Sequence, residues 1–179
     1  MANRDLTGIL LVGGSSTRFG SPKALARLGD ETLAERAWWL LRSTCAETIA
    51  VGKRSDGLTL PFPILDDGSS VRAPIAGLVA GLRAARHEVC VVLPVDVPLL
   101  SAASVEALAE ACADAAVSQT GPLPGAYRKR ALPILERRLA AGRLKLREAV
   151  AELDTRLVRL DTAELANVNA KEDLERLSR

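Results

Sequence analysis

The sequence predicts an α/β protein in which helices cover both faces of a mostly parallel β-sheet. Two observations carry this prediction. Short apolar runs, typical of buried parallel strands, alternate along the chain with amphipathic segments of helical length. Strands joined through such helices make right-handed crossovers, which place helices on both sides of one sheet. The expected architecture is therefore a three-layer α/β/α sandwich. A length of 179 residues fits one domain over residues 1–179.

The N-terminal part of the chain is expected to form a strand, a helix and a second strand. Residues 7–12 (TGILLV) are an apolar run that ends at a pair of glycines, as is typical of a buried parallel strand. Residues 31–45 place their apolar side chains on one stripe of a helix, with Asp30 as the candidate N-cap. Residues 48–51 form a short apolar run, which predicts the second strand.

The middle of the chain contains its most apolar run. Residues 63–65 predict a short third strand, which is followed directly by two aspartates. Residues 74–86 predict a helix because apolar side chains recur there at helical spacing. These side chains are Ile75, Leu78, Val79 and Leu82. Residues 89–95 (VCVVLPV) are the most apolar run, so we expect a central strand that ends at Asp96.

The C-terminal half adds shorter elements. Ser101 can cap a helix, and residues 115–118 predict a further strand. The segment 121–127 (GPLPGAY) is rich in turn-forming residues and is expected to be a turn. The remaining predicted elements are helices over residues 130–141, 147–153 and 171–177 and a strand over residues 156–160.

The composition argues against several classes of partner. Lys and Arg number 24 and Asp and Glu number 22, so the net charge of +2 provides no drive toward nucleic acid or an anionic membrane. Aromatic residues make up 3% of the chain, too few for base-stacking platforms. No apolar run is long enough to span a membrane, and the first is too short for a signal peptide. We therefore expect a cytoplasmic protein.

The cysteines and the single histidine argue against other chemistry. Cys45, Cys90 and Cys112 are odd in number, lie in apolar stretches and form no Cys-x-x-Cys pair, so we expect buried, reduced thiols. His87 has no candidate ligand partners near it in the sequence. This argues against a zinc site built from histidine and cysteine and against Ser-His-Asp catalysis.

Polar residues follow three of the predicted strands at the point where each strand ends. They are the loop 13–23, the pair Asp66-Asp67, and Asp96. In open α/β sheets, ligands bind outside the carboxyl ends of the strands, where the strand order reverses. We therefore expect these three segments to form one site.

The glycine-rich loop after the first strand is a candidate phosphate-binding loop. Gly13, Gly14 and Gly20 allow the backbone to approach a ligand, and exposed backbone N–H groups in such loops bind anions. Arg18 and Lys23 add positive charges that can pair with phosphate oxygens. The spacing matches neither the Walker A loop nor G-x-G-x-x-G. The combination favours phosphate binding over an ordinary connection with solvated charges.

Asp96 is the candidate metal ligand. A carboxylate at the mouth of an apolar strand suits Mg²⁺, which takes one or two carboxylates together with substrate phosphates and water. The competing interpretation, a helix-capping aspartate, is weakened because Ser101 is better placed to cap the next helix. Asp66 and Asp67 have two interpretations: one of them contacts a ribose or the metal, or the pair forms an Asp-Asp-Gly turn.

Two further polar groups have open roles. Asn167 and Asn169 are candidates for contact with a polar substrate, or else are loop and N-cap residues of the following helix. Arg128, Lys129 and Arg130 are either a solvated helix start or a binding site for an anionic second substrate.

Five segments, taken in order along the chain, resemble the molybdenum cofactor guanylyltransferase family and its relatives in the nucleotidyltransferase superfamily. The segments are LVGGSSTRFGSPKAL, APIAGLVAGL, LPVDVPLL, PLPGAYRKRALPIL and ANVNAKEDL, which together cover nearly the whole chain. The first and third are typical of the superfamily. The Pro-Ile-Ala-Gly and Asn-x-Asn segments point to the molybdenum cofactor branch.

The resemblance implies a Rossmann-like nucleotidyltransferase fold and Mg²⁺-dependent transfer of GMP from GTP to molybdopterin, with release of pyrophosphate. Proteins that deliver or receive the cofactor would be further partners. By position, the implied nucleotide-binding residues are Leu11, Val12, Gly13, Gly14, Lys23, Asp66 and Asp96. The implied catalytic residues are Lys23, Arg18 and Asp96, with Asp96 as the Mg²⁺ ligand. Asn167 and Asn169 would serve the pterin side.

One departure from the family pattern leaves the choice of nucleotide open. Some members have a nucleotide-contacting asparagine after the second strand, where this chain has Gly52-Lys53-Arg54. A cytidylyltransferase that acts on the same cofactor would share most of the motifs. A sugar-phosphate nucleotidyltransferase and a non-catalytic nucleotide-binding module also stay open as functions. The presence of Arg18, Lys23 and Asp96 argues against the non-catalytic module.

Overall fold

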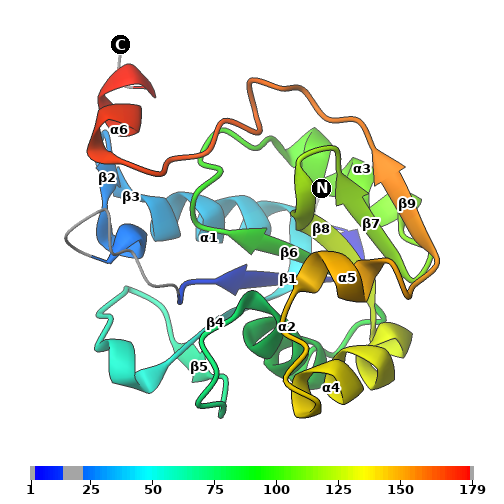
Figure 1. The fold of residues 1–179 in the computed structure, drawn as a ribbon. Helices are drawn as coiled ribbons and strands as arrows, with labels where there is room; N and C mark the ends of the chain where they lie inside the picture. Colours follow the sequence, from blue (N-terminus) through cyan, green and yellow to red (C-terminus); the bar gives the residue numbers. More distant parts are fainter. Residues whose placement is uncertain (1–2, 14–21, 178–179) are drawn as a thin grey trace.

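A seven-stranded sheet forms the centre of the protein in a computed structural model, which describes residues 3–13 and 22–177 (Figure 1). The strands are β1 (Asn3–Leu11), β4 (Cys45–Gly52), β5 (Ile64–Asp66), β6 (Val89–Pro94), β7 (Ala115–Ser118), β8 (Gly121–Arg128) and β9 (Thr155–Val158). Their order in the sheet is β5-β4-β1-β6-β8-β7-β9. Only β8 is antiparallel to its neighbours, which confirms the mostly parallel sheet.

Helices cover both faces of this sheet, as the sequence predicts. One face packs against α1 (Leu33–Thr44) and α3 (Ala102–Ala111), and the other against α2 (Pro74–Ala84), α4 (Leu132–Ala140) and α5 (Leu146–Val150). Successive strand side chains point to opposite faces. Leu10 of β1 accordingly joins the core under α1 and α3, whereas Ile9 joins the core under α2. A last helix, α6 (Lys171–Leu177), ends the described chain.

The start of α1 differs from the prediction. Thr32 is the N-cap: its side chain accepts a hydrogen bond from the Glu35 amide, while the Glu35 carboxylate accepts one from the Thr32 amide. This reciprocal pair is a capping box. Asp30 cannot cap the helix because it lies in the two-residue turn between the short strands β2 (Arg27–Leu28) and β3 (Glu31–Thr32). Gly29 begins that turn with a φ of +68°.

The segment 121–127 is a strand, β8, so the prediction of a turn is wrong. Its prolines are tolerated because the ladder with β6 involves only residues 125–128. Proline is excluded from strand positions whose N–H must join the ladder, and Pro122 and Pro124 precede that part of β8. The other predicted helices and strands are present: β7 and α6 have the predicted ends, and most of the others have shifted ends.

The strand order reverses next to β1. From β1 the chain moves to β4 and β5 on one side and then to β6 on the other. The segments that follow the carboxyl ends of β1, β4 and β6 therefore meet at one edge of the sheet, where ligands bind in folds of this type. Within the described residues, no helix is long and apolar enough to cross a membrane.

Candidate functional site

Three side chains from distant parts of the chain meet at the carboxyl edge of β1 and β6. The Lys23 ammonium lies 3.4 Å from Oδ2 of Asp96 and donates a hydrogen bond to Oδ1 of Asn169, also at 3.4 Å. The side chains of Lys23 and Asp96 are 18% and 28% exposed, so both reach solvent while remaining partly enclosed. The structure thus brings Lys23 and Asp96 together, as the sequence predicts, and adds Asn169. The third segment expected at this site, Asp66-Asp67, lies instead beside Lys53 and Arg54.

Asp96 is presented by the buried strand before it. Val95 and Val97 on either side are buried, which turns the intervening Asp96 side chain toward the edge. The backbone carbonyl of Asp96 accepts a hydrogen bond from the Val168 amide at 2.9 Å. This bond ties the Asp96 turn to the segment that carries Asn169.

Lys23 is held by a short turn with one buried anchor. It opens the 3₁₀ helix η1 (Lys23–Leu25), in which Ala24 is buried in the core beneath α1. The Ala26 amide donates to the Lys23 carbonyl at 3.0 Å and closes the turn. Ala24 points inward, and the Lys23 side chain extends toward Asp96.

Asn169 reaches the site on a C-terminal segment, residues 159–170, which runs from β9 to α6 (Figure 1). Leu160, Leu165 and Val168 are buried along it. The Glu164 carboxylate accepts hydrogen bonds from the Ser101 amide at 3.0 Å and the Ser104 hydroxyl at 2.6 Å, which fastens the segment to the start of α3. Partial burial acts to raise the pKa of Glu164, but these hydrogen bonds together bring it below the usual value.

The two candidate asparagines have different surroundings. Asn169 contacts Lys23, and its backbone amide donates to Asp173 at 2.8 Å at the start of α6. Asn167 is exposed on the other side of buried Val168, and the described part of the chain provides no side-chain partner for it. Only Asn169 joins the cluster around Lys23.

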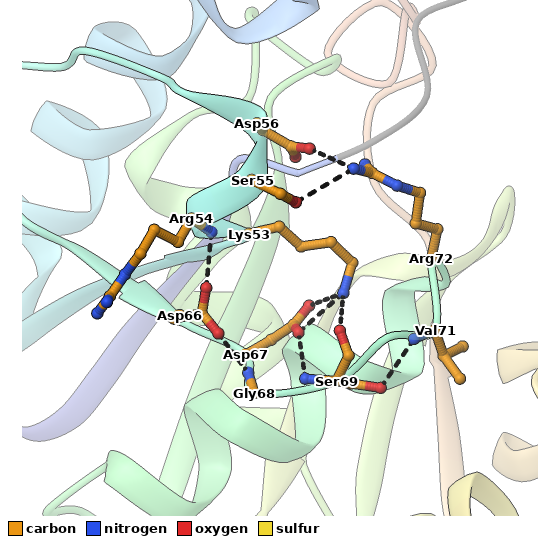
Figure 2. Close-up of polar contacts among 10 residues, drawn as sticks. All are labelled: Lys53, Arg54, Ser55, Asp56, Asp66, Asp67, Gly68, Ser69, Val71 and Arg72. Atoms are coloured by element: carbon orange, nitrogen blue, oxygen red, sulfur yellow. Dashed lines mark hydrogen bonds and ion pairs between the residues drawn. The ribbon is translucent and has the colours of Figure 1, made fainter.

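A second polar cluster lies over β4 and β5 (Figure 2). The Lys53 ammonium contacts both oxygens of Asp67, at 2.9 and 3.0 Å, and the Ser69 carbonyl at 2.6 Å. Both side chains of this pair are nearly buried, at 11% and 7% exposure. The Asp67 amide donates to the Gly52 carbonyl at 2.9 Å. Lys53 and Asp67 therefore join the loops that follow the two strands.

Asp66 also holds these loops together. One carboxylate oxygen accepts the Arg54 amide at 2.6 Å, and the other accepts the Gly68 amide at 2.8 Å. These hydrogen bonds lower the pKa of Asp66. This geometry is that of a turn aspartate, the second of the two interpretations of the Asp66-Asp67 pair. Figure 2 shows the Asp66 side chain among the residues around Lys53. A contact between Asp66 and the nucleotide stays a prediction.

The end of β1 separates the two clusters. Leu11 is buried in the core under α2, and Val12 is buried in the core under α1. Gly13, the next residue, is exposed at the carboxyl end of the strand. A Cβ at Gly13 would lie 3.6 Å from Gly52 Cα and 3.7 Å from Oδ2 of Asp56. The predicted site residues Gly14 and Arg18, together with Gly20, lie outside the described residues.

The basic run 128–130 lies at the opposite edge of the sheet. Arg128 pairs with Val89 at the start of β6, whereas Asp96 follows the end of that strand. Arg128 and Lys129 donate to the carbonyls of Cys112 and Ala85, and Arg130 pairs with Asp114. These contacts fix the run in place at the end of β6 opposite to Asp96, so it is not part of the cluster around Lys23.

Comparison with known proteins agrees with this arrangement. The family model of the MobA-like NTP transferase domain matches residues 8–157. The chain belongs to the MobA-like NTP transferase family. It is a nucleotidyltransferase, and the matched region contains both Lys23 and Asp96.

Relatives in this family match over almost their full length. A molybdenum cofactor guanylyltransferase from Desulfosudis oleivorans is 31% identical, covering 96% of this chain and 93% of the relative. A protein from Opitutus terrae, named a probable molybdenum cofactor guanylyltransferase, is 34% identical, covering 96% and 94%. The crystal structure of molybdopterin-guanine dinucleotide biosynthesis protein A from Archaeoglobus fulgidus has the same fold, with a TM-score of 0.81 at 23% identity over 96% of both chains.

Proposed function

We propose that this nucleotidyltransferase transfers GMP from GTP to the terminal phosphate of molybdopterin, with Mg²⁺ as cofactor and pyrophosphate as the leaving product. The names of the relatives support the nucleotide and the acceptor. The observation that carries the proposal is the meeting of Lys23, Asp96 and Asn169 at the strand-order reversal. We further propose that the protein works in the cytoplasm, with proteins that deliver or receive the cofactor as partners.

The residues around Lys23 fit a magnesium ion. Asp96 and Asn169 both direct a side-chain oxygen at the same ammonium group, so the two oxygens already face one positive charge. Such oxygens are the ligands that Mg²⁺ prefers, with the remaining positions taken by substrate phosphates and water. Asp96 would hold the ion, with Asn169 within reach. When bound, Mg²⁺ would neutralise charge on the phosphates and orient them.

Lys23 would stabilise the charge that develops on the leaving pyrophosphate. An oxygen of the acceptor phosphate attacks the α-phosphorus of GTP, a new P–O bond forms, and the bond to pyrophosphate breaks. The attacking phosphate oxygen already carries negative charge, so no side chain has to remove a proton. The protein therefore contributes positioning and charge stabilisation. Arg18 is proposed to assist Lys23 on the triphosphate.

Asn169 would link the acceptor to the reacting phosphates. It is carried by the C-terminal segment 159–170, and its side-chain oxygen lies against Lys23. An acceptor bound along this segment would bring its terminal phosphate to Lys23 and Asp96. Exposed Asn167 would contact the pterin further out on the same segment.

The direct test is to incubate the protein with MgCl₂, each of the four NTPs, and either molybdopterin or a sugar phosphate as the acceptor. Pyrophosphate and the dinucleotide product are then measured by chromatography and mass spectrometry. We expect product with GTP and a large loss with Lys23→Ala. Product formed with CTP in preference would indicate a cytidylyltransferase. Transfer only to a sugar phosphate would indicate a sugar-phosphate nucleotidyltransferase. Nucleotide binding without pyrophosphate release from any NTP would contradict the proposal.

A further inference from the structure

The cluster around Lys23 and the cluster around Lys53 together limit where the nucleoside part of the substrate can bind. Lys23 and Asp96 lie beside the ends of β1 and β6, where the phosphates are proposed to bind. The ends of β4 and β5 lie on the other side of β1, and Gly13 lies between them and Lys23. A nucleotide whose phosphates contact Lys23 and whose sugar crosses Gly13 therefore places its base beside the 3₁₀ helix η2 (Arg54–Asp56).

Asp56 is the acidic residue of η2. Its Oδ2 lies 3.7 Å from the position that a Cβ would take at Gly13. Its Oδ1 pairs with Arg72 at 2.7 Å, and Arg72 also donates to the Ser55 hydroxyl at 3.4 Å (Figure 2). The Asp56 side chain is only 14% exposed, whereas Arg72 is 49% exposed. Within the described part of the chain, Oδ2 has no hydrogen-bond donor, so it can accept one from a ligand.

The backbone fixes the direction of this carboxylate. The Asp56 amide donates to the Lys53 carbonyl at 3.0 Å, and Gly57 ends the turn with a φ of +60°. Lys53 is itself anchored by the nearly buried pair with Asp67. The carboxylate is thus carried by a turn that is tied to the loop after β5, and Arg72 restrains it from the other side.

We propose that Asp56 is the specificity-determining residue that selects guanine, an inference that rests on the proposed function. A carboxylate offers only acceptors, with about four lone-pair positions on its two oxygens. The Watson–Crick edge of guanine presents two adjacent donors, the N1–H and the 2-amino group. Adenine and cytosine each present a ring-nitrogen acceptor at the corresponding place, and uracil presents one donor between two carbonyls. Among the four common bases, guanine alone matches a carboxylate with two adjacent donors.

The test uses GTP, ITP and XTP, which differ in the group at position 2 of the purine. Their binding to the protein is measured by calorimetry in the presence of Mg²⁺. Wild type should bind GTP about 10-fold or more tightly than ITP, which lacks only the 2-amino group. Asp56→Asn should weaken GTP binding by roughly 10- to 100-fold, the usual cost of losing hydrogen bonds to a charged group. The same variant should bind XTP more tightly than wild type does, because the asparagine amide can donate to the 2-carbonyl of xanthine.

A gain of XTP binding requires a folded site, so it separates base reading from a structural role of Asp56. Glu136→Gln changes a partly exposed carboxylate that pairs with Arg83 between α4 and α2, and as the matched control it should leave all three affinities unchanged. Wild type that binds ITP as tightly as GTP, or an Asp56→Asn variant that keeps the GTP preference, would overturn the role of Asp56 alone. Wild type that binds no NTP, or that prefers CTP, would overturn this inference and the proposed function together.

Discussion

Removing the Glu164 carboxylate should loosen the C-terminal segment that carries Asn169. Glu164→Ala leaves the largely buried Ser104 hydroxyl and the Ser101 amide without the acceptor that they share. An unpaired buried polar group costs about 1–3 kcal/mol, and we expect about 2 kcal/mol here. For a protein of this size, that loss corresponds to a fall in melting temperature of about 4–8 °C. Glu164→Gln keeps one acceptor oxygen and should cost less than half as much.

The assay is urea unfolding, combined with steady-state kinetics of nucleotidyl transfer. The KM for the acceptor should rise more than the KM for GTP, because Glu164 anchors the segment that bears Asn169 and not Lys23. Glu110 is an exposed glutamate on α3, so Glu110→Ala is the matched control. It should change neither the stability in urea nor the two KM values. Full stability of Glu164→Ala, or equal changes in the two KM values, would show that Glu164 does not anchor the segment.

The lowered pKa of Glu164 adds a pH dependence with a definite sign. A group whose pKa is lower in the folded state stabilises the protein above its unfolded pKa, and that contribution is lost as the pH falls through the folded value. The unfolded pKa of a glutamate is about 4.3, so the Glu164 contribution should be complete at neutral pH and be lost progressively as the pH falls below that value. The stability difference between wild type and Glu164→Gln should therefore shrink as the pH is lowered below about 4. A difference that is constant between pH 7 and pH 3 would contradict the assignment.

Three further substitutions test the site and the core. Lys23→Ala should lower the transfer rate by ~10²–10³-fold with the melting temperature nearly unchanged, and full activity would contradict its role. Lys53→Ala removes the positive charge that pairs with nearly buried Asp67 and should lower the free energy of unfolding by about 3 kcal/mol. An unfolding midpoint equal to that of wild type would rule this out. Gly8→Ala places a Cβ 2.8 Å from the Leu41 Cβ and should cost about 1–3 kcal/mol, so unchanged unfolding would show that α1 can move away.

The parts of the fold that depend on apolar runs were predictable from the sequence. Residues 9–11 at the end of β1 and residues 90–93 of β6 are all apolar and buried, so the pattern there is unambiguous. Strand β8 was not predictable, because its prolines and glycines indicate a turn and only its register against β6 makes them acceptable. The cap of α1 was misplaced by two residues, because the short hairpin before it adds a turn that mimics a cap.

The sequence indicates candidate site residues where charged side chains follow a predicted strand. Lys23 and Asp96 could be singled out because they lie in the polar segments after the apolar ends of β1 and β6, and the structure places them 3.4 Å apart. The contact of Asn169 with Lys23 joins residues 146 positions apart and depends on the path of the C-terminal segment, which no local pattern encodes. Asp56 lies in a polar loop without periodicity, and only its approach to Gly13 distinguishes it from its neighbours.

The most direct test of the proposed site is a crystal structure of the protein with Mg²⁺ and a non-hydrolysable GTP analogue. We predict the triphosphate against Lys23 with the metal on Asp96, the sugar over Gly13, and the guanine edge facing Asp56. A triphosphate bound instead among Lys53, Arg54 and Arg72, with Lys23 still paired to Asp96 and Asn169, would contradict this placement of the nucleotide.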